Sequence, residues 1–151
     1  MLEGRYLGAR TSTELGDVSV HGVVISYRMQ DVSSGTQPWR RHLDFLRGLD
    51  RLLPKEPRST LLLGDFNQRV PRKFQSLDAY STLESVVLTR FALATGGSLA
   101  PLGKQAIDHI CHSHDLRRID ALAISNMCDD GIQISDHFGV AAQFVEANSV
   151  L

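Results

Sequence analysis

The sequence has no long hydrophobic run and few cysteines, and each of these absences excludes a class of protein. No apolar stretch approaches the roughly 20 residues that a membrane-spanning helix needs. Residues 1–10 contain no apolar core, so they predict neither a secretory signal nor a membrane anchor. The two cysteines, Cys111 and Cys128, do not have the spacing of metal ligands. They indicate reduced thiols and therefore a cytoplasmic protein.

An excess of charge of one sign is also missing. Sixteen basic and seventeen acidic residues give a net charge of −1. The chain as a whole therefore lacks the positive field of a dedicated duplex-binding protein, and any nucleic-acid interface would have to be local. An apolar fraction of 42% and a charged fraction of 22% are typical of a globular protein. The length of 151 residues suits one domain with a buried core.

Alternating strand-like and helix-like patterns predict an α/β fold. Residues 1–17 are polar and aperiodic, and we expect them to form a leader before a domain that occupies residues 18–151. Runs of apolar and β-branched residues predict strands at 18–27, 60–65, 106–111, 119–124 and 138–144. Apolar residues that recur every three or four positions predict helices at 38–53 and 80–91.

Three short polar strings stand at the boundaries of the apolar runs. They are Gly64-Asp65-Phe66-Asn67, Ile107-Asp108-His109-Ile110 and Ser135-Asp136-His137. A buried strand that ends in a carboxylate places this group at the rim of the sheet, where a ligand can reach it. Together the strings supply three carboxylates, one amide and one imidazole, a set that suits hydrolysis of a phosphate ester at a divalent metal.

The order and context of these strings resemble the endonuclease/exonuclease/phosphatase superfamily, which includes deoxyribonuclease I, abasic-site endonucleases, neutral sphingomyelinases and inositol-polyphosphate 5-phosphatases. The resemblance covers residues 18–144 and implies part of a four-layer α/β/β/α sandwich. We expect the amino-terminal half of that fold, with its metal-binding Glu and active-site Asn, to be absent from this chain. The resemblance also implies Mg²⁺-dependent or Mn²⁺-dependent hydrolysis by an activated water. The substrate would be a nucleic acid, a phospholipid or a small phosphate ester.

The resemblance also implies a role for each polar residue of the strings. Asp65 would accept a proton from the attacking water or position it, and Asn67 would orient that water. His137 would donate to the scissile phosphate, while Asp108 would bond the other ring nitrogen of His137. The metal ligands would be Asp65, Asn67 and Asp136. The structural alternative is an Asx turn at Asp65, a strand-end cap at Asp108 and a surface position for His137.

Two further groups of residues stay open between a functional and a structural interpretation. Tyr27 ends the first predicted strand, where it would either bind phosphate or simply pack against its neighbours. Arg69, Arg72 and Lys73 follow the strand that ends at Asp65. They would either clamp the phosphate oxygens of the substrate or form a solvated surface loop.

The rival interpretation of the whole chain is a truncated, non-catalytic half-domain with a binding role or no activity. In the superfamily, the strand after Ser-Asp-His joins the sheet that the amino-terminal half mostly builds. We therefore expect residues 138–144 to have few strand neighbours. An exposed sheet face of this kind would promote self-association.

Overall fold

A five-stranded sheet forms the centre of the computed structural model, which describes residues 4–148. Its order is β1-β2-β3-β7-β4. The strands are β1 (Tyr6–Thr13), β2 (Gly16–Val24), β3 (Thr60–Asp65), β7 (Asp108–His112) and β4 (Ala92–Leu93). β2 and β3 run parallel, and all other neighbours in this sheet are antiparallel. The carboxyl end of β3 therefore lies beside the amino end of β7.

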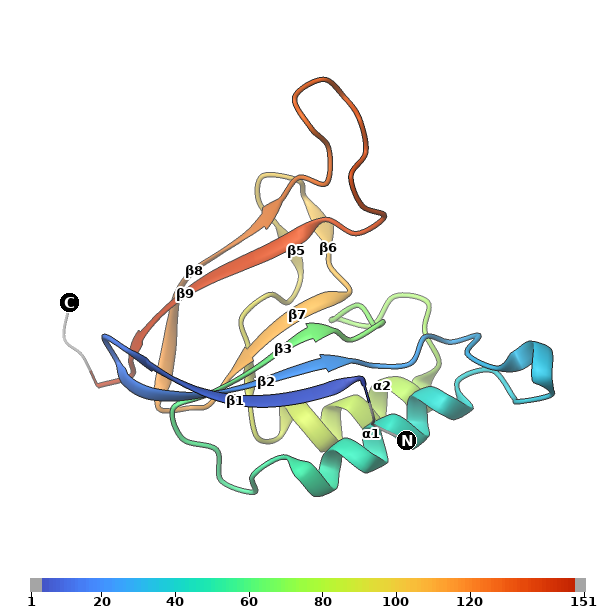
Figure 1. Ribbon diagram of the computed structural model, residues 1–151, viewed down its shortest axis with the longest axis horizontal. Coiled ribbons are helices and arrows are strands. Elements are labelled where there is room, and N and C mark those ends of the chain that lie inside the picture. The colour runs from blue at the N-terminus through green and yellow to red at the C-terminus, as the bar shows by residue number, and fades with distance from the viewer. Residues whose placement is uncertain (1–3, 149–151) are drawn as a thin grey trace.

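Two helices cover one face of this sheet (Figure 1). α1 (Arg40–Leu52) buries Phe45, Leu46 and Leu49 in the main hydrophobic core, which also contains Leu62 of β3. α2 (Leu77–Leu83) continues into a π-helical turn, η2 (Glu84–Leu88), and a short 3₁₀ helix, η1 (Val32–Ser34), precedes α1. The helix predicted at 38–53 is thus confirmed as α1, because its apolar stripe packs on the sheet as the spacing indicates.

A separate antiparallel pair, β8 (Leu116–Ile124) and β9 (Gly139–Glu146), lies on the opposite side of the central sheet (Figure 1). A small hairpin of β5 (Ser98–Leu99) and β6 (Lys104–Gln105) adjoins it, and a second, smaller core forms there. Phe138 and Val140 pack against this core. Within the described residues β9 pairs with β8 alone, so residues 138–144 have one strand neighbour, in agreement with the expectation of few.

The first 17 residues differ from the polar leader that the sequence predicts, because β1 lies within them. β1 pairs with β2 from Tyr6 opposite Val23 to Thr13 opposite Gly16. Almost every side chain of β1 is exposed. Its sequence therefore lacks the alternation of apolar and polar residues by which a half-buried strand is recognised. Two β-branched residues, Thr11 and Thr13, were the available signal.

A buried polar chain joins α1 to the loop after β3. His42 is fully buried, and its Nδ1 donates to the carbonyl of Ser26 at 2.7 Å. Its Nε2 accepts from Nε2 of Gln68 at 2.7 Å, and the same Gln68 amide donates to the carbonyl of Ala79 at 2.9 Å. Burial lowers the pKa of His42 from its ordinary value of 6.5 to about 4, although the Ser26 bond partly opposes this change. The folded protein therefore holds His42 neutral at pH 7.

This lowered pKa predicts an acid-sensitive fold. The unfolded chain protonates His42 below about pH 6.5, whereas the folded chain does so only near pH 4. The free energy of unfolding should therefore be fully maintained above pH 6.5 and fall as the pH is lowered towards 4. The His42 contribution to this loss is about 3 kcal/mol. Urea unfolding followed by circular dichroism across this range measures it.

Two substitutions isolate the contribution of His42. His42→Gln should lose stability less steeply between pH 6.5 and 4 than the wild type, because no proton is taken up at this position on unfolding. His114→Gln, at an exposed histidine, should keep the wild-type slope. Equal slopes for His42→Gln and the wild type would contradict the assignment.

Candidate active site

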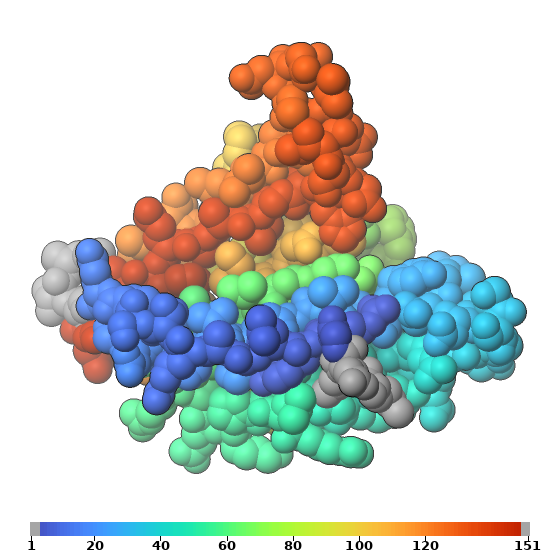
Figure 2. Space-filling model, in the orientation of Figure 1, coloured from blue at the N-terminus to red at the C-terminus, as the bar shows by residue number. Residues whose placement is uncertain are grey.

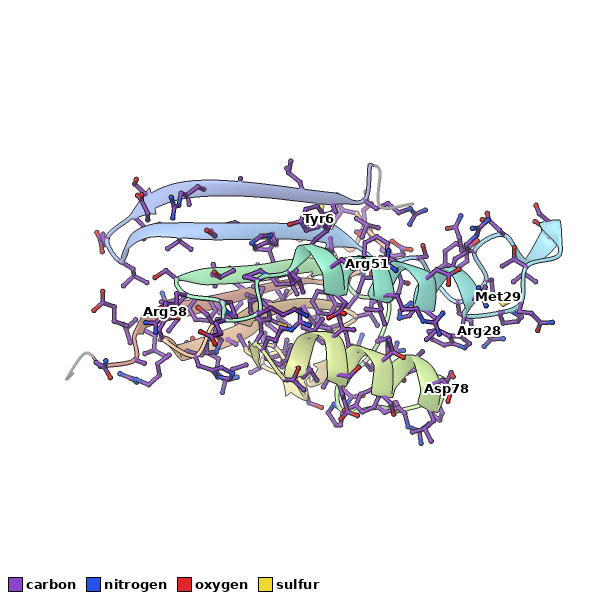
Figure 3. The ribbon with its side chains drawn as sticks, turned by 90° about the horizontal axis from the view of Figure 1, so that it is seen from below. Tyr6, Arg28, Met29, Arg51, Arg58 and Asp78 are labelled. Carbon is purple, nitrogen blue, oxygen red and sulfur yellow. The ribbon has the colours of Figure 1, made fainter. Side chains whose placement is uncertain are left out.

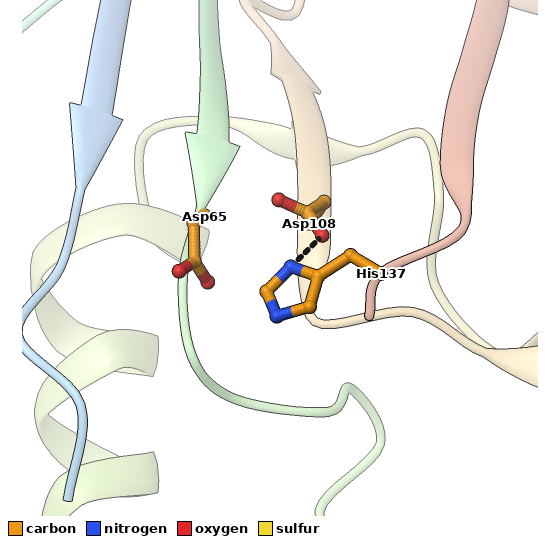
Figure 4. Close-up of side chains that lie close together, drawn as sticks. All are labelled: Asp65, Asp108 and His137. Carbon is orange, nitrogen blue, oxygen red and sulfur yellow. Dashed lines mark hydrogen bonds and ion pairs between the residues drawn. The ribbon is translucent and has the colours of Figure 1, made fainter. Parts of the chain in front are cut away.

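Three titratable side chains converge at the rim of the central sheet (Figure 4). Asp65 ends β3, Asp108 begins β7, and the two residues are directly opposite each other in the antiparallel pairing. His137 lies in the segment just before β9. Each of the three offers an oxygen or nitrogen atom within 4.8 Å of the others. The sheet rim thus assembles two carboxylates and one imidazole from three distant parts of the sequence.

His137 is oriented by Asp108. The Nδ1 of His137 donates to Oδ2 of Asp108 at 2.7 Å, and both side chains are half-buried, with exposed fractions of 32% and 26%. A carboxylate on one ring nitrogen selects the tautomer and leaves the other nitrogen, Nε2, for a ligand. The predicted bond between Asp108 and His137 is therefore present.

Asp65 is held by its near neighbour in sequence, Asn67. The backbone N–H of Asn67 donates to Oδ1 of Asp65 at 2.8 Å, and its side-chain amide donates to Oδ2 at 2.7 Å and to the carbonyl of Ile25 at 2.9 Å. Asn67 has a left-handed backbone, with φ of 51°. The Asx turn and the shared site thus occur together, since the bonds that close the turn also orient the Asp65 carboxylate.

The Asp65 carboxyl has an altered proton affinity. Burial raises its pKa above the ordinary value, and the negative charge of Asp108 adds to this effect. The bonds from Asn67 and the proximity of His137 act in the opposite direction but do not cancel it. A carboxylate with a raised pKa is a stronger proton acceptor than an exposed aspartate.

Asp136 lies at the exposed edge of the three converging side chains. Its side chain is 93% exposed, and its Oδ2 lies 3.9 Å from Nε2 of His137. The structure therefore brings Asp65 and Asn67 of the predicted metal set into contact with each other, whereas Asp136 approaches the site from solvent.

A cleft of about 670 Å³ opens beside the site and contains the predicted basic loop. Asp108, Asp136 and His137 line it. The basic residues Arg69, Arg72 and Lys73 line the same cleft. Tyr27 is not among the lining residues; it is half-exposed, two residues beyond Ile25 in the segment after β2.

Four other polar residues line this cleft and were missed by sequence reasoning: Ser98, Lys104, Gln105 and Asn126. Asn126 follows β8, and its side-chain amide donates to the carbonyl of Ser135 at 2.7 Å, so it ties together the ends of the β8–β9 loop. This loop projects from the rest of the molecule (Figure 2). A polar residue after an apolar strand was the signal, as it was for Asp65. Lys104 lies in the two-residue strand β6, and a single lysine in a turn-rich segment gave no signal.

Comparisons with known proteins agree with this geometry. The sequence profile of the Endonuclease/Exonuclease/phosphatase family matches residues 4–137. A search of curated proteins found no match. Among solved structures, the chain is similar to an endonuclease/exonuclease/phosphatase from Beutenbergia cavernae DSM 12333. The TM-score is 0.65 and the identity 16%, over 93% of this chain and 39% of that one.

Two further solved structures share the fold. One is an endonuclease/exonuclease/phosphatase family protein from Leptotrichia buccalis C-1013-b, with a TM-score of 0.59 and 15% identity over 93% of this chain and 53% of that one. The other is the endonuclease domain of TRAS1, a telomere-specific non-LTR retrotransposon, with a TM-score of 0.55 and 11% identity over 96% of this chain and 63% of that one. The chain thus spans 39–63% of the length of these three structures. The predicted α/β fold of the deoxyribonuclease I type is confirmed, while the four-layer arrangement and the missing amino-terminal half stay predictions.

Proposed function

Because the chain belongs to the endonuclease/exonuclease/phosphatase family, we propose that it hydrolyses a phosphoester bond by means of a divalent metal ion and an activated water. The observation that carries this proposal is the convergence of Asp65, Asp108 and His137 within 4.8 Å of one another. Such an arrangement supplies a proton acceptor for the water and an oriented donor for the phosphate.

Each residue of the site has a distinct part in this chemistry. Asp65, whose pKa is raised by burial, accepts a proton from the attacking water. Nε2 of His137 faces the phosphate, where a donor stabilises the negative charge that develops on the non-bridging oxygens. Asp108 keeps the imidazole in the required tautomer through the 2.7 Å bond to Nδ1. Asn67 orients Asp65 and, through it, the water.

The donor set fits a hard divalent cation, because carboxylate and amide oxygens are the ligands that Mg²⁺ prefers. Mg²⁺ or Mn²⁺ would be held by Asp65, Asn67 and Asp136 and would supply positive charge beside the phosphate oxygens. Substrates compatible with this chemistry are a nucleic acid, a phospholipid and a small phosphate ester, so the activity would be that of a nuclease, phosphodiesterase or phosphatase.

The alternative is a chain that binds a phosphoester without turning it over. The exposure of Asp136 favours this alternative, since a side chain that is 93% exposed is not held in place as a metal ligand should be. Hydrolysis under defined metal conditions separates the two.

Among residues 4–148, no helix is long and apolar enough to cross a membrane.

We propose a cytoplasmic location from the free thiols of Cys111 and Cys128. We also propose that the half-buried face of β9 supports self-association, which size-exclusion chromatography with light scattering would detect.

Removal of the metal should abolish activity. With bis(4-nitrophenyl) phosphate as a small diester, excess EDTA should lower the rate to the uncatalysed background, because the charge that the cation supplies is lost. Added Mg²⁺ or Mn²⁺ should restore the rate. Equal turnover in EDTA and in Mg²⁺ would refute metal dependence, and no turnover with either metal would favour the non-catalytic alternative.

A further inference from the structure

The loop that follows Asn67 is organised around one buried side chain. Gln75 is 8% exposed, and its Oε1 accepts from the backbone N–H groups of Lys73 and Phe74, both at 3.0 Å. The Nε2 of Gln75 donates to the carbonyl of Arg69. In turn, the Nη1 of Arg72 donates to the backbone carbonyl of Gln75 at 3.0 Å. The conformation of the loop is therefore held by internal bonds before any ligand binds, which lowers the entropic cost of binding.

This loop exposes an aromatic ring next to the cleft. Phe74 is 87% exposed, the largest exposed fraction among the exposed large hydrophobic residues. The Nζ of Lys73, a residue that lines the cleft, lies 5.6 Å from the centre of the Phe74 ring. A ring presented in this way on an internally bonded loop is a surface on which a planar, apolar group can stack.

The cleft beside the ring contains a local concentration of positive charge. Arg69, Arg72, Lys73 and Lys104 all line it. The chain as a whole has a net charge of −1, so this cluster does not reflect a generally basic surface. Four cations exceed what one scissile phosphate needs, and they suit a ligand that carries several phosphates.

We propose that the substrate is an unpaired nucleic-acid strand, an inference that rests on the proposed function of the same site. Phosphates on either side of the scissile group contact the four cations, and an unpaired base next to them stacks on Phe74. A duplex hides its base faces within the helical stack, so it cannot use the ring. A phospholipid with a choline headgroup brings a positive charge that the basic cleft repels, and a small phosphate ester leaves most of the cations unused.

Binding of a fluorescein-labelled dT12 oligonucleotide in EDTA, measured by fluorescence anisotropy, tests the proposal without cleavage. Phe74→Leu removes the π-face but keeps an apolar side chain, and it should weaken binding roughly 5- to 100-fold. Phe74→Tyr should restore binding to within about twofold, because it retains a ring that stacks. Wild-type protein should bind an abasic 12-mer of the same backbone as weakly as Phe74→Leu binds dT12.

The salt dependence tests the cations separately. Lys73→Ala and Lys104→Ala should each reduce the slope of log affinity against log salt concentration by about 0.7, the value for one phosphate contact on a single strand. Arg51→Ala is the matched control. Arg51 is exposed on α1, on the helix-covered face of the sheet, and its loss should change neither affinity nor slope (Figure 3).

Three results would overturn the proposal: equal affinity of dT12 and the abasic strand, unchanged binding by Phe74→Leu, or tighter binding of a 12-base-pair duplex than of dT12. Hydrolysis of the small diester by the wild type in Mg²⁺ is the separate test of the proposed function. If the wild type binds dT12 as expected but leaves the diester intact, the hydrolytic function fails while the strand-binding site stands.

Discussion

His137→Ala and Asp65→Asn are each expected to lower phosphoester hydrolysis by roughly 10²- to 10⁴-fold. His137→Ala removes the donor that Asp108 orients through the 2.7 Å bond, and the alanine leaves the phosphate charge unsupported. Asp65→Asn keeps the shape of the side chain but removes the proton acceptor. Steady-state rates with bis(4-nitrophenyl) phosphate in Mg²⁺ measure both losses.

The two substitutions are expected to be non-additive. If acceptor and donor act in the same step, the double variant should be scarcely less active than the less active of the two single variants. His114→Ala, at an exposed histidine outside the cleft-lining set, should retain wild-type rates. Each variant should unfold at a urea concentration close to that of the wild type, which separates lost chemistry from lost structure. Wild-type rates in both single variants would refute the assigned roles.

Gly64→Ala is expected to cost roughly 4 kcal/mol or more of unfolding free energy, or to prevent folding. A Cβ atom at Gly64 would lie 2.0 Å from the carbonyl oxygen of Val23 and 3.1 Å from its nitrogen. The φ of Gly64 is 132°, a conformation that other residues rarely adopt. Val23 cannot move away, because β2 and β3 pair at this position. Urea unfolding followed by circular dichroism gives the free energy.

Gly22→Ala provides the matched control. Gly22 lies in the same pair of strands, and the nearest atom to its added Cβ is the carbonyl oxygen of Leu7 at 3.9 Å, an ordinary contact. The change at this position should stay within about 1 kcal/mol. If the two alanine variants unfold alike, strands β2 and β3 do not approach each other as closely as the structure shows. The glycine of Gly64-Asp65-Phe66-Asn67 therefore contributes backbone geometry rather than chemistry.

Sequence reasoning succeeded where burial imposes a pattern. The strand predicted at 60–65 coincides with β3 because its leucines are an apolar run with polar ends. The bond between Asp108 and His137, which the family resemblance implied, is present in the structure at 2.7 Å. By contrast, the exposed edge strand β1 carries no burial pattern to recognise.

The buried polar contacts were beyond sequence reasoning for a different reason. His42 and Gln68 are 26 positions apart, and each looks like a surface residue in a polar segment. Only the packing of α1 against the loop after β3 turns them into partners. The strands β4, β5 and β6 have two residues each, which is too short for any periodicity, and Lys104 was missed along with them.

The bonded pair of Asp108 and His137 joins two sheets that share no backbone ladder. Asp108 belongs to the central sheet, whereas His137 leads into β9 of the separate β8–β9 pair. Side chains align these layers, through the contact of the His112 and Phe144 rings, whose centres are 5.1 Å apart, and through the bond from Nη1 of Arg118 to the carbonyl of Ala94 at 2.6 Å. A slip of one layer over the other by about 1 Å would stretch the imidazole–carboxylate bond while every strand pairing survived. The rate of hydrolysis would then report a shift between the two layers that circular dichroism, which detects secondary structure, would not.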